Sequence, residues 1–192
     1  MNIDGKADRL ELFNLKSRHT RVFHLSWFAF FACFFAWFGI APLMPVIREE
    51  LSLTKSQIGN IMIASVSATV FMRMLMGWLC DRIGPRITYS ALLIGGSVPV
   101  MCIGLAHDYH SFLFFRLLIG AIGGSFVITQ YHTSVFYSSR CVGTANATSA
   151  GWGNLGGGVT QMVMPLVLSL LVAAGVSEFW GWRISMLVVG IF

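Results

Sequence analysis

The sequence predicts an all-α protein embedded in a membrane, and three observations lead to that fold class. Hydrophobic residues make up 56% of the 192 positions and charged residues only 11%, whereas a soluble domain has about 25% charged residues. The mean hydropathy is +0.73. Apolar runs of about 20 residues, the length of a membrane-spanning helix, recur along the chain. The composition therefore predicts a multi-pass protein in contact with the lipid bilayer.

A polar leader precedes the predicted spans. Residues 1–22 carry five basic and three acidic residues and are too polar to insert, so we expect a flexible cytoplasmic tail. The membrane bundle then occupies residues 23–192. The five complete spans are predicted at 23–43, 57–79, 87–106, 111–136 and 144–174. A sixth span begins near Arg183 and covers 183–192, which is too short to cross a bilayer as a helix, so we expect a chain truncated within helix six.

The basic residues of the short loops predict the orientation. Eight Lys and Arg residues lie on the side of the leader and three on the opposite side, which predicts a cytoplasmic N-terminus in the inner (cytoplasmic) membrane of a cell. The net charge of +5 is thereby assigned to topology and not to nucleic-acid binding. The four Cys residues lie in or beside apolar runs without close pairing, so we interpret them as packing residues. Neither a metal nor a cofactor is expected.

The loop after the second span reads GWLCDRIGPR. A topogenic turn alone explains it about as well as a functional element does. However, it resembles the G-x-x-x-D-R-x-G-x-R loop between helices two and three of the major facilitator superfamily. The matching positions are Gly77, Asp81, Arg82, Gly84 and Arg86. In that superfamily the loop latches the N-terminal bundle to the C-terminal one on the cytoplasmic side, so the resemblance implies a gating role.

Span four contains RLLIGAIGG, which resembles the R-x-x-x-G-x-x-x-G element of the same superfamily. Its Arg116 opens the span near the outer face, where the side chain can reach the interface. We therefore favour a structural or coupling role for Arg116 over substrate contact. His132, with Gln130 two positions before it, lies deeper in the same span. These two side chains either line a cavity or merely form a hydrogen bond with one another.

Arg73 lies well inside the second span, four residues before Gly77. An ionised Arg within the bilayer costs at least about 2.5–3.5 kcal/mol, so it normally faces a cavity or a partner. The alternatives are snorkelling to the cytoplasmic edge and a buried ion pair, yet no acidic residue lies inside any of the five complete spans. The pattern indicates an anion site, because the planar fork of N–H donors suits a planar oxyanion.

The fifth span contains five glycines within NATSAGWGNLGGGVTQ, residues 146–161. The stretch lacks the Lys-Ser/Thr ending of a phosphate-binding loop. On a helix, Asn154, Gly157, Gly158 and Gln161 share one side, and Gly153 with Gly157 forms a G-x-x-x-G pair. Two interpretations remain open. The glycines serve tight helix packing alone, or they form a substrate-lining surface in which Asn154 supplies a hydrogen bond.

The segment AGWGNLGGGVTQMVMP, Ala150 to Pro165, resembles the fifth-helix signature of the nitrate/nitrite porter family within that superfamily. FHLSWFAFF and APLMPVIREELSLTKSQIGN are similar to its first helix and first loop. The resemblance implies an N-terminal six-helix bundle that pairs with a missing C-terminal six-helix half. It also implies a site with one Arg from helix two and one from helix eight. Arg73 matches the first, and the second lies outside this chain.

What the resemblance implies for function is a secondary transporter of nitrate and nitrite working by alternating access. We expect nitrate uptake with proton symport, which would serve nitrate assimilation. Proton coupling would involve His132, the surroundings of Arg116, or the missing half. Nitrate/nitrite exchange remains an alternative, as does a non-transporting half-carrier that acts as a sensor or subunit. An enzyme is disfavoured because the spans hold no nucleophile–base pair or metal cluster.

Overall fold

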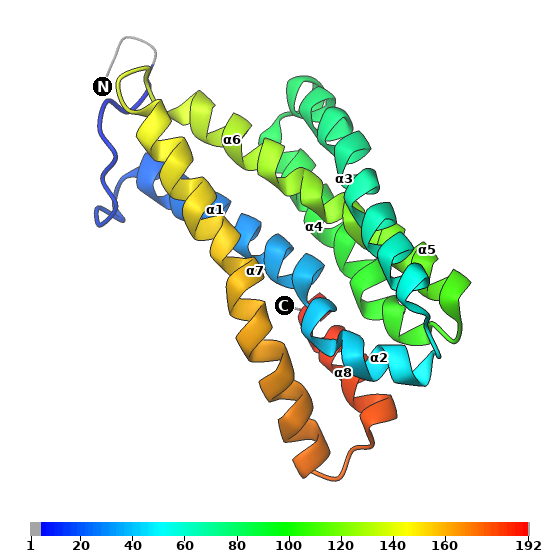
Figure 1. The fold of residues 1–192 in the computed structure, drawn as a ribbon. Helices are drawn as coiled ribbons and strands as arrows, with labels where there is room; N and C mark the ends of the chain where they lie inside the picture. Colours follow the sequence, from blue (N-terminus) through cyan, green and yellow to red (C-terminus); the bar gives the residue numbers. More distant parts are fainter. Residues whose placement is uncertain (1–4, 192) are drawn as a thin grey trace.

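The computed structural model describes residues 5–191, which fold into a bundle of helices (Figure 1). Within that range the only β-type pairing is an isolated bridge between Ala7 and Tyr137. The all-α prediction is therefore confirmed. The elements in chain order are α1 (Arg18–Phe38), η1 (Ala41–Leu43), α2 (Met44–Glu50), α3 (Lys55–Ile83), α4 (Pro85–Cys102), η2 (Ile103–Leu105), α5 (Tyr109–Gly120), η3 (Ala121–Gly124), α6 (Ser125–Phe136), α7 (Val142–Ala173) and α8 (Glu178–Ile191).

Within residues 5–191, five stretches are long and apolar enough to cross a membrane. They are Arg18–Glu50, Lys55–Ile83, Pro85–Leu105, Tyr109–Phe136 and Val142–Ala173. The first begins five residues before the predicted start at 23 and continues through the short turn η1 into α2, so the helical path is longer than its apolar core. Helix α8 has 14 residues, fewer than the roughly 20 that a span needs.

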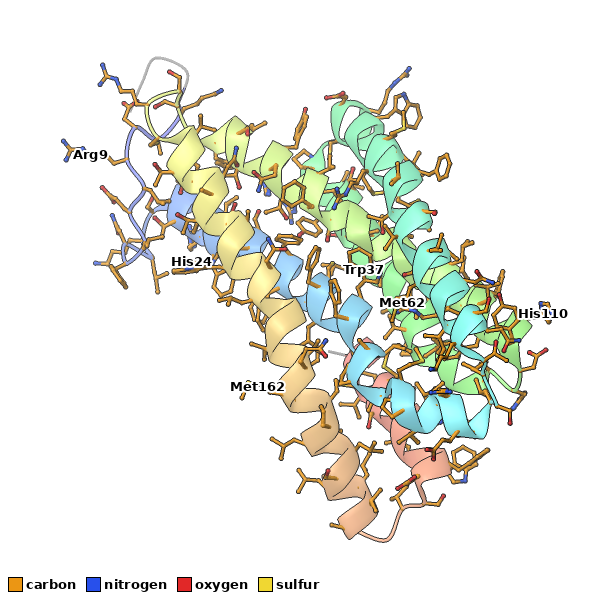
Figure 2. The ribbon with its side chains drawn as sticks, viewed as in Figure 1. Arg9, His24, Trp37, Met62, His110 and Met162 are labelled. Atoms are coloured by element: carbon orange, nitrogen blue, oxygen red, sulfur yellow. The ribbon has the colours of Figure 1, made fainter. Side chains whose placement is uncertain are left out.

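The ends of the bundle differ in composition. The leader, the turn between α3 and α4 and the connection between α6 and α7 all lie at one end (Figure 1). These three segments hold the basic residues that we counted together on the cytoplasmic side. At the sides of the bundle, large apolar residues are exposed. Met162 on α7 is 75% exposed and points away from the other helices (Figure 2). In a membrane such residues contact lipid or another helical bundle.

Glycines allow span four to pack closely on span two. A Cβ atom added to Gly120 would overlap the backbone carbonyl of Ser65 on α3. The Thr69 hydroxyl, also on α3, donates a 2.7 Å hydrogen bond to the Gly120 carbonyl. The polypeptide changes from α to 3₁₀ geometry directly after this contact, at η3. The glycines of the RLLIGAIGG element therefore set the distance between α3 and the α5–α6 span.

At the end of the bundle away from the leader, α8 is joined to α2 by a buried ion pair. Arg183 is 6% exposed and pairs with Glu50, with 2.9 Å between Nη1 and Oε2. Its Nε donates to the Gly104 carbonyl at 2.8 Å, and the indole N–H of Trp182 donates to Glu50 at 2.7 Å. The guanidinium also lies 3.9 Å from the ring centre of Phe179. This outer cluster is defined by Glu50, Arg183 and Trp182.

The described part of the leader, residues 5–17, is hydrogen-bonded to the bundle, although we expected a flexible tail. The amide of Ala7 donates to the Phe136 carbonyl at 3.0 Å, and the amide of Ser138 donates to the Ala7 carbonyl at 3.0 Å. The Thr20 hydroxyl donates to the Glu11 carbonyl at 2.7 Å. Residues 1–4 lie outside the described range. These bonds fix the leader against α1 and the α6–α7 connection.

Candidate functional site

Arg73 projects from α3 as an exposed side chain. Its guanidinium carbon lies 5.4 Å from the centre of the Phe126 ring on α6. No carboxylate within residues 5–191 pairs with it. An unpaired guanidinium on a membrane-spanning helix has unused N–H donors, which is the chemistry that an anion requires.

Phe126 was not predicted from the sequence as a site residue. Its ring packs against Phe30 on α1, with ring centres 5.7 Å apart, so side chains from α1, α3 and α6 meet beside Arg73. Cation–π attraction of about 0.5–1 kcal/mol favours a guanidinium close to such a ring. The sequence offered only one indication of its role, its position two residues after Gly124 on span four. That indication is weak because the chain contains sixteen Phe residues.

The glycines of α7 divide between two faces. A Cβ on Gly153 would overlap the Phe30 ring, and one on Gly157 would approach the Phe38 ring to 3.1 Å. Both glycines therefore face α1, which lies alongside α7 (Figure 1). Asn154 is exposed, and a Cβ on Gly158 would meet nothing within 4 Å. Of the predicted binding residues on this helix, only Asn154 and Gly158 leave open space for a ligand.

The structure does not place α7 directly against α3. Helix α6 lies between the two and packs on both (Figure 1). Arg73 and the open face of α7 thus flank α6 on opposite sides. Gln130 on α6 donates from its amide to the Asn146 carbonyl of α7 at 3.4 Å, so it does not pair with His132. The arrangement forms one wall of an open surface, with the charge and the small residues on separate helices.

We predict that two neighbouring glycines of α7 respond differently to alanine. A Cβ on Gly156 would overlap the Phe31 carbonyl of α1, a backbone atom that cannot move aside. Gly156→Ala should destabilise the chain by about 1–3 kcal/mol through overpacking. Gly158→Ala, which enters open space, should be neutral or slightly stabilising because Ala favours helix. Thermal unfolding in detergent measures both, and equal losses would contradict a close α1–α7 contact.

The predicted gating loop forms a tight turn. Helix α3 ends at Ile83, and Gly84 takes a φ of +83°, a left-handed conformation that glycine adopts without strain. Pro85 follows at the first position of α4, where its missing N–H is not needed. The Gly-Pro pair thereby reverses the chain within one residue and sets the direction of α4.

The charged residues around this turn are exposed. Asp81 lies beside the Tyr131 hydroxyl on α6, and the Arg82 guanidinium lies 5.3 Å from the centre of the Trp78 ring. Arg86 is also exposed. Gly77 faces α6, since an added Cβ would come 3.8 Å from Val127. The three charges remain available for another surface, and Gly77 lies at a helix contact.

The two predicted coupling residues have different environments. Arg116 donates from Nη1 to the Trp37 carbonyl near the end of α1, at 3.0 Å, and its buried Nε has no partner among the described residues. His132 is half-buried, and its Nδ1 lies 2.7 Å from the Ser26 hydroxyl on α1. His132 also borders a groove of about 550 Å³ between α1, α4 and α6.

The fold defines a class of membrane protein: a bundle of apolar helices with a charged Gly-Pro turn after the second span and an unpaired Arg within that span. The chain belongs to the major facilitator superfamily, whose family model matches residues 26–192. The resemblance to the N-terminal half of the nitrate/nitrite porters is confirmed by its relatives.

The names of those relatives all refer to the transport of nitrate, or of nitrate and nitrite. The chain is similar to high affinity nitrate transporter 2.5 of Arabidopsis thaliana, with 44% identity over 192 residues, all of this chain and 38% of the relative. It is 38% identical to nitrate transporter 2.1 of Chlamydomonas reinhardtii over 99% of this chain and 35% of that protein. Nitrate/nitrite transporter NrtP of Nostoc punctiforme is 35% identical, over 94% and 36%. The chain thus spans well under half the length of these relatives.

Proposed function

We propose that this chain forms the N-terminal half of a secondary transporter that carries nitrate and nitrite across the cytoplasmic membrane by alternating access. The observation that carries the proposal is Arg73, an unpaired guanidinium on a membrane-spanning helix. Nitrate is a planar oxyanion, and the guanidinium offers coplanar N–H donors to its oxygens. The nitrate transporters among its relatives support this substrate class.

In the proposed site, Arg73 supplies charge and the Phe126 ring limits where the guanidinium can lie. Asn154 and the open space at Gly158 supply a second wall on α7. Gly153 and Gly157 do not line the proposed site; they allow α7 to pack closely against α1. Transporter sites of this class lie between two helical bundles, so a complementary six-helix half would close the pocket.

Gating is proposed to use the exposed charges Asp81, Arg82 and Arg86 at the α3–α4 turn. Such charges form ion pairs or helix-end contacts with an opposing surface in one state and lose them in another, which biases the equilibrium between the states. With the N-terminus in the cytoplasm, this contact would close the pathway on the inner side.

Proton symport is proposed for uptake, with the half-buried His132 as the titratable group and Arg116, whose buried Nε has no partner among the described residues, as a cation that responds to the charge of the anion. No carboxylate lies inside the predicted spans to perform the task. A group that binds a proton in one state and releases it in the other couples transport to the proton gradient.

Nitrate uptake in proteoliposomes tests the function. A chain extended to the length of its relatives should accumulate labelled nitrate, and an inward proton gradient should raise the initial rate severalfold if transport is symport. Stimulation only by nitrite loaded inside the vesicles would instead establish exchange. Residues 1–192 alone serve as the control and should show no uptake. A folded, extended protein without any nitrate flux would overturn the proposal in favour of a sensor or subunit.

A further inference from the structure

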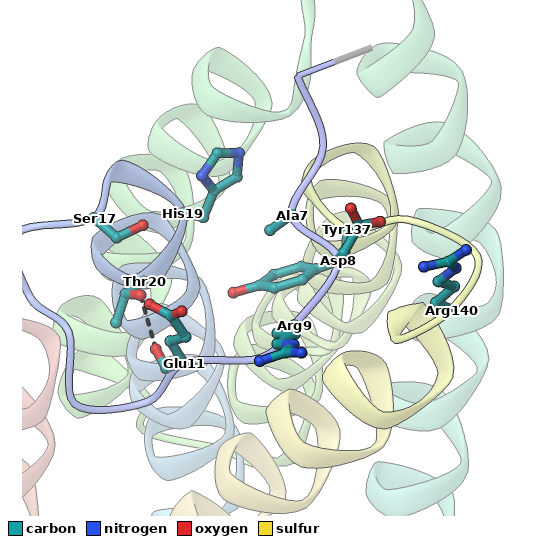
Figure 3. A pocket seen from close by; sticks show the side chains of 9 residues that line it. All are labelled: Ala7, Asp8, Arg9, Glu11, Ser17, His19, Thr20, Tyr137 and Arg140. Carbon is teal, nitrogen blue, oxygen red and sulfur yellow. Dashed lines mark hydrogen bonds between the residues drawn. The ribbon is translucent and has the colours of Figure 1, made fainter. Parts of the chain in front are cut away.

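A cavity of about 480 Å³ lies at the leader end of the bundle, between residues 7–11, the first turn of α1 and the α6–α7 connection (Figure 3). Its lining includes the charged side chains Arg9, Glu11 and Arg140. None of the residues assigned to the proposed transport site borders it. The cavity therefore needs a separate explanation.

Tyr137 forms one side of this cavity. The residue is 2% exposed, and its hydroxyl has no hydrogen-bond partner among the described residues. Figure 3 shows the hydroxyl pointing into the cavity, towards Thr20 and Glu11. Burial, followed by the negative charges of Cys141 and Glu11 when ionised, raises the pKa of Tyr137 to about 12. The phenol is thus protonated at neutral pH, and its O–H needs an acceptor.

The N-terminus of α1 opens onto the same cavity. Ser17 occupies the N-cap position without making a side-chain capping hydrogen bond, and Ser17, His19 and Thr20 all border the cavity. The first amides of a helix have no partner within the helix and carry part of its positive dipole. The end of a 21-residue helix therefore attracts an anion.

Two guanidinium groups complete the donor set. Arg9 and Arg140 both line the cavity, Arg9 from the leader and Arg140 from the α6–α7 connection (Figure 3). Neither forms an ion pair with a residue in the range 5–191. Two carboxylates, Asp8 and Glu11, also border the cavity, and Glu11 accepts a 2.8 Å hydrogen bond from the Asn14 amide. With two charges of each sign, the lining favours a monoanion over a dianion.

We propose that this cavity binds a small, singly charged oxyanion, held by the Tyr137 hydroxyl, the first amides of α1 and the guanidinium groups of Arg9 and Arg140. The bound anion would join the leader to the α6–α7 connection. This site is independent of the proposed transport function, because it uses neither Arg73 nor the open face of α7.

The test uses purified residues 1–192 in neutral detergent. Nitrate, sulfate and chloride are titrated at constant ionic strength by calorimetry, and soluble short-chain phosphatidylglycerol is titrated separately. We expect nitrate to bind and to raise the midpoint of thermal unfolding by linkage. Sulfate and chloride should bind at least about tenfold more weakly. Binding of phosphatidylglycerol without nitrate would support the same oxyanion chemistry with a lipid headgroup as its source.

Matched variants assign the binding to the cavity. Tyr137→Phe removes only the unpaired hydroxyl and should weaken nitrate binding about tenfold, as should Arg140→Gln. Tyr109→Phe removes a phenol hydroxyl and Lys55→Gln removes a positive charge elsewhere on the chain, and both should leave binding unchanged. The proposal is overturned if chloride binds as tightly as nitrate, or if no oxyanion binds to a folded chain. It is equally overturned if Arg73→Gln removes nitrate binding while Arg140→Gln and Tyr137→Phe retain it.

Discussion

Replacing Arg73 with alanine in the extended protein is expected to abolish nitrate uptake while the protein stays folded. The side chain is exposed in this half and contacts the Phe126 ring, so its removal opens no cavity in the core. Each lost charge-assisted hydrogen bond to nitrate is worth about 1.5–3 kcal/mol. Loss of two such bonds should reduce uptake by about 10²-fold or more.

Arg73→Lys provides a sharper version of the same test. Lysine keeps the positive charge but not the planar fork of donors, so uptake should recover only in part. Arg21→Gln removes a charge from an exposed position outside the site and serves as the control. Initial rates of labelled nitrate uptake, normalised to folded protein, measure all three variants. A rate for Arg73→Ala within a few-fold of the parent protein would remove Arg73 from the site.

Arg183→Met is expected to destabilise the bundle by about 3–5 kcal/mol, because it leaves Glu50 largely buried without its ion-pair partner. The substitution also removes the donor to the Gly104 carbonyl at the end of span three. Adding Glu50→Gln removes the stranded charge, so the double variant should regain part of that loss. Two elements more than 130 residues apart therefore depend on one another for stability.

Reversible unfolding in mixed detergent and denaturant measures this coupling as a double-mutant cycle. The control substitutions are Arg48→Met and Glu49→Gln, which make the same changes at exposed positions on α2 beside Glu50. Both controls should stay within about 0.5 kcal/mol of the parent chain. If the losses from Arg183→Met and Glu50→Gln simply add, the two side chains do not interact in the folded protein.

The sequence allowed prediction of features that depend on neighbours along the chain. Apolar run length predicted the spans, and the GWLCDRIGPR motif predicted the loop after the second span, since both depend on residues close together in the sequence. The outer cluster was not predicted, because Glu50 and Arg183 are brought together only by packing. Arg183 was instead predicted to mark the start of a sixth span. In the same way, helical spacing grouped Gly157 with Asn154, whereas the position of α1 places Gly157 at a helix contact.

The contact between α1 and α7 at Gly156 has a mechanical consequence. At this point no side chain separates the backbones of the two helices, so there is no deformable layer that could absorb sliding. Close-packed interfaces of this kind shift between discrete arrangements and do not deform continuously. We therefore expect α7 either to keep its register with α1 or to move along it by a discrete step, and not to slide gradually.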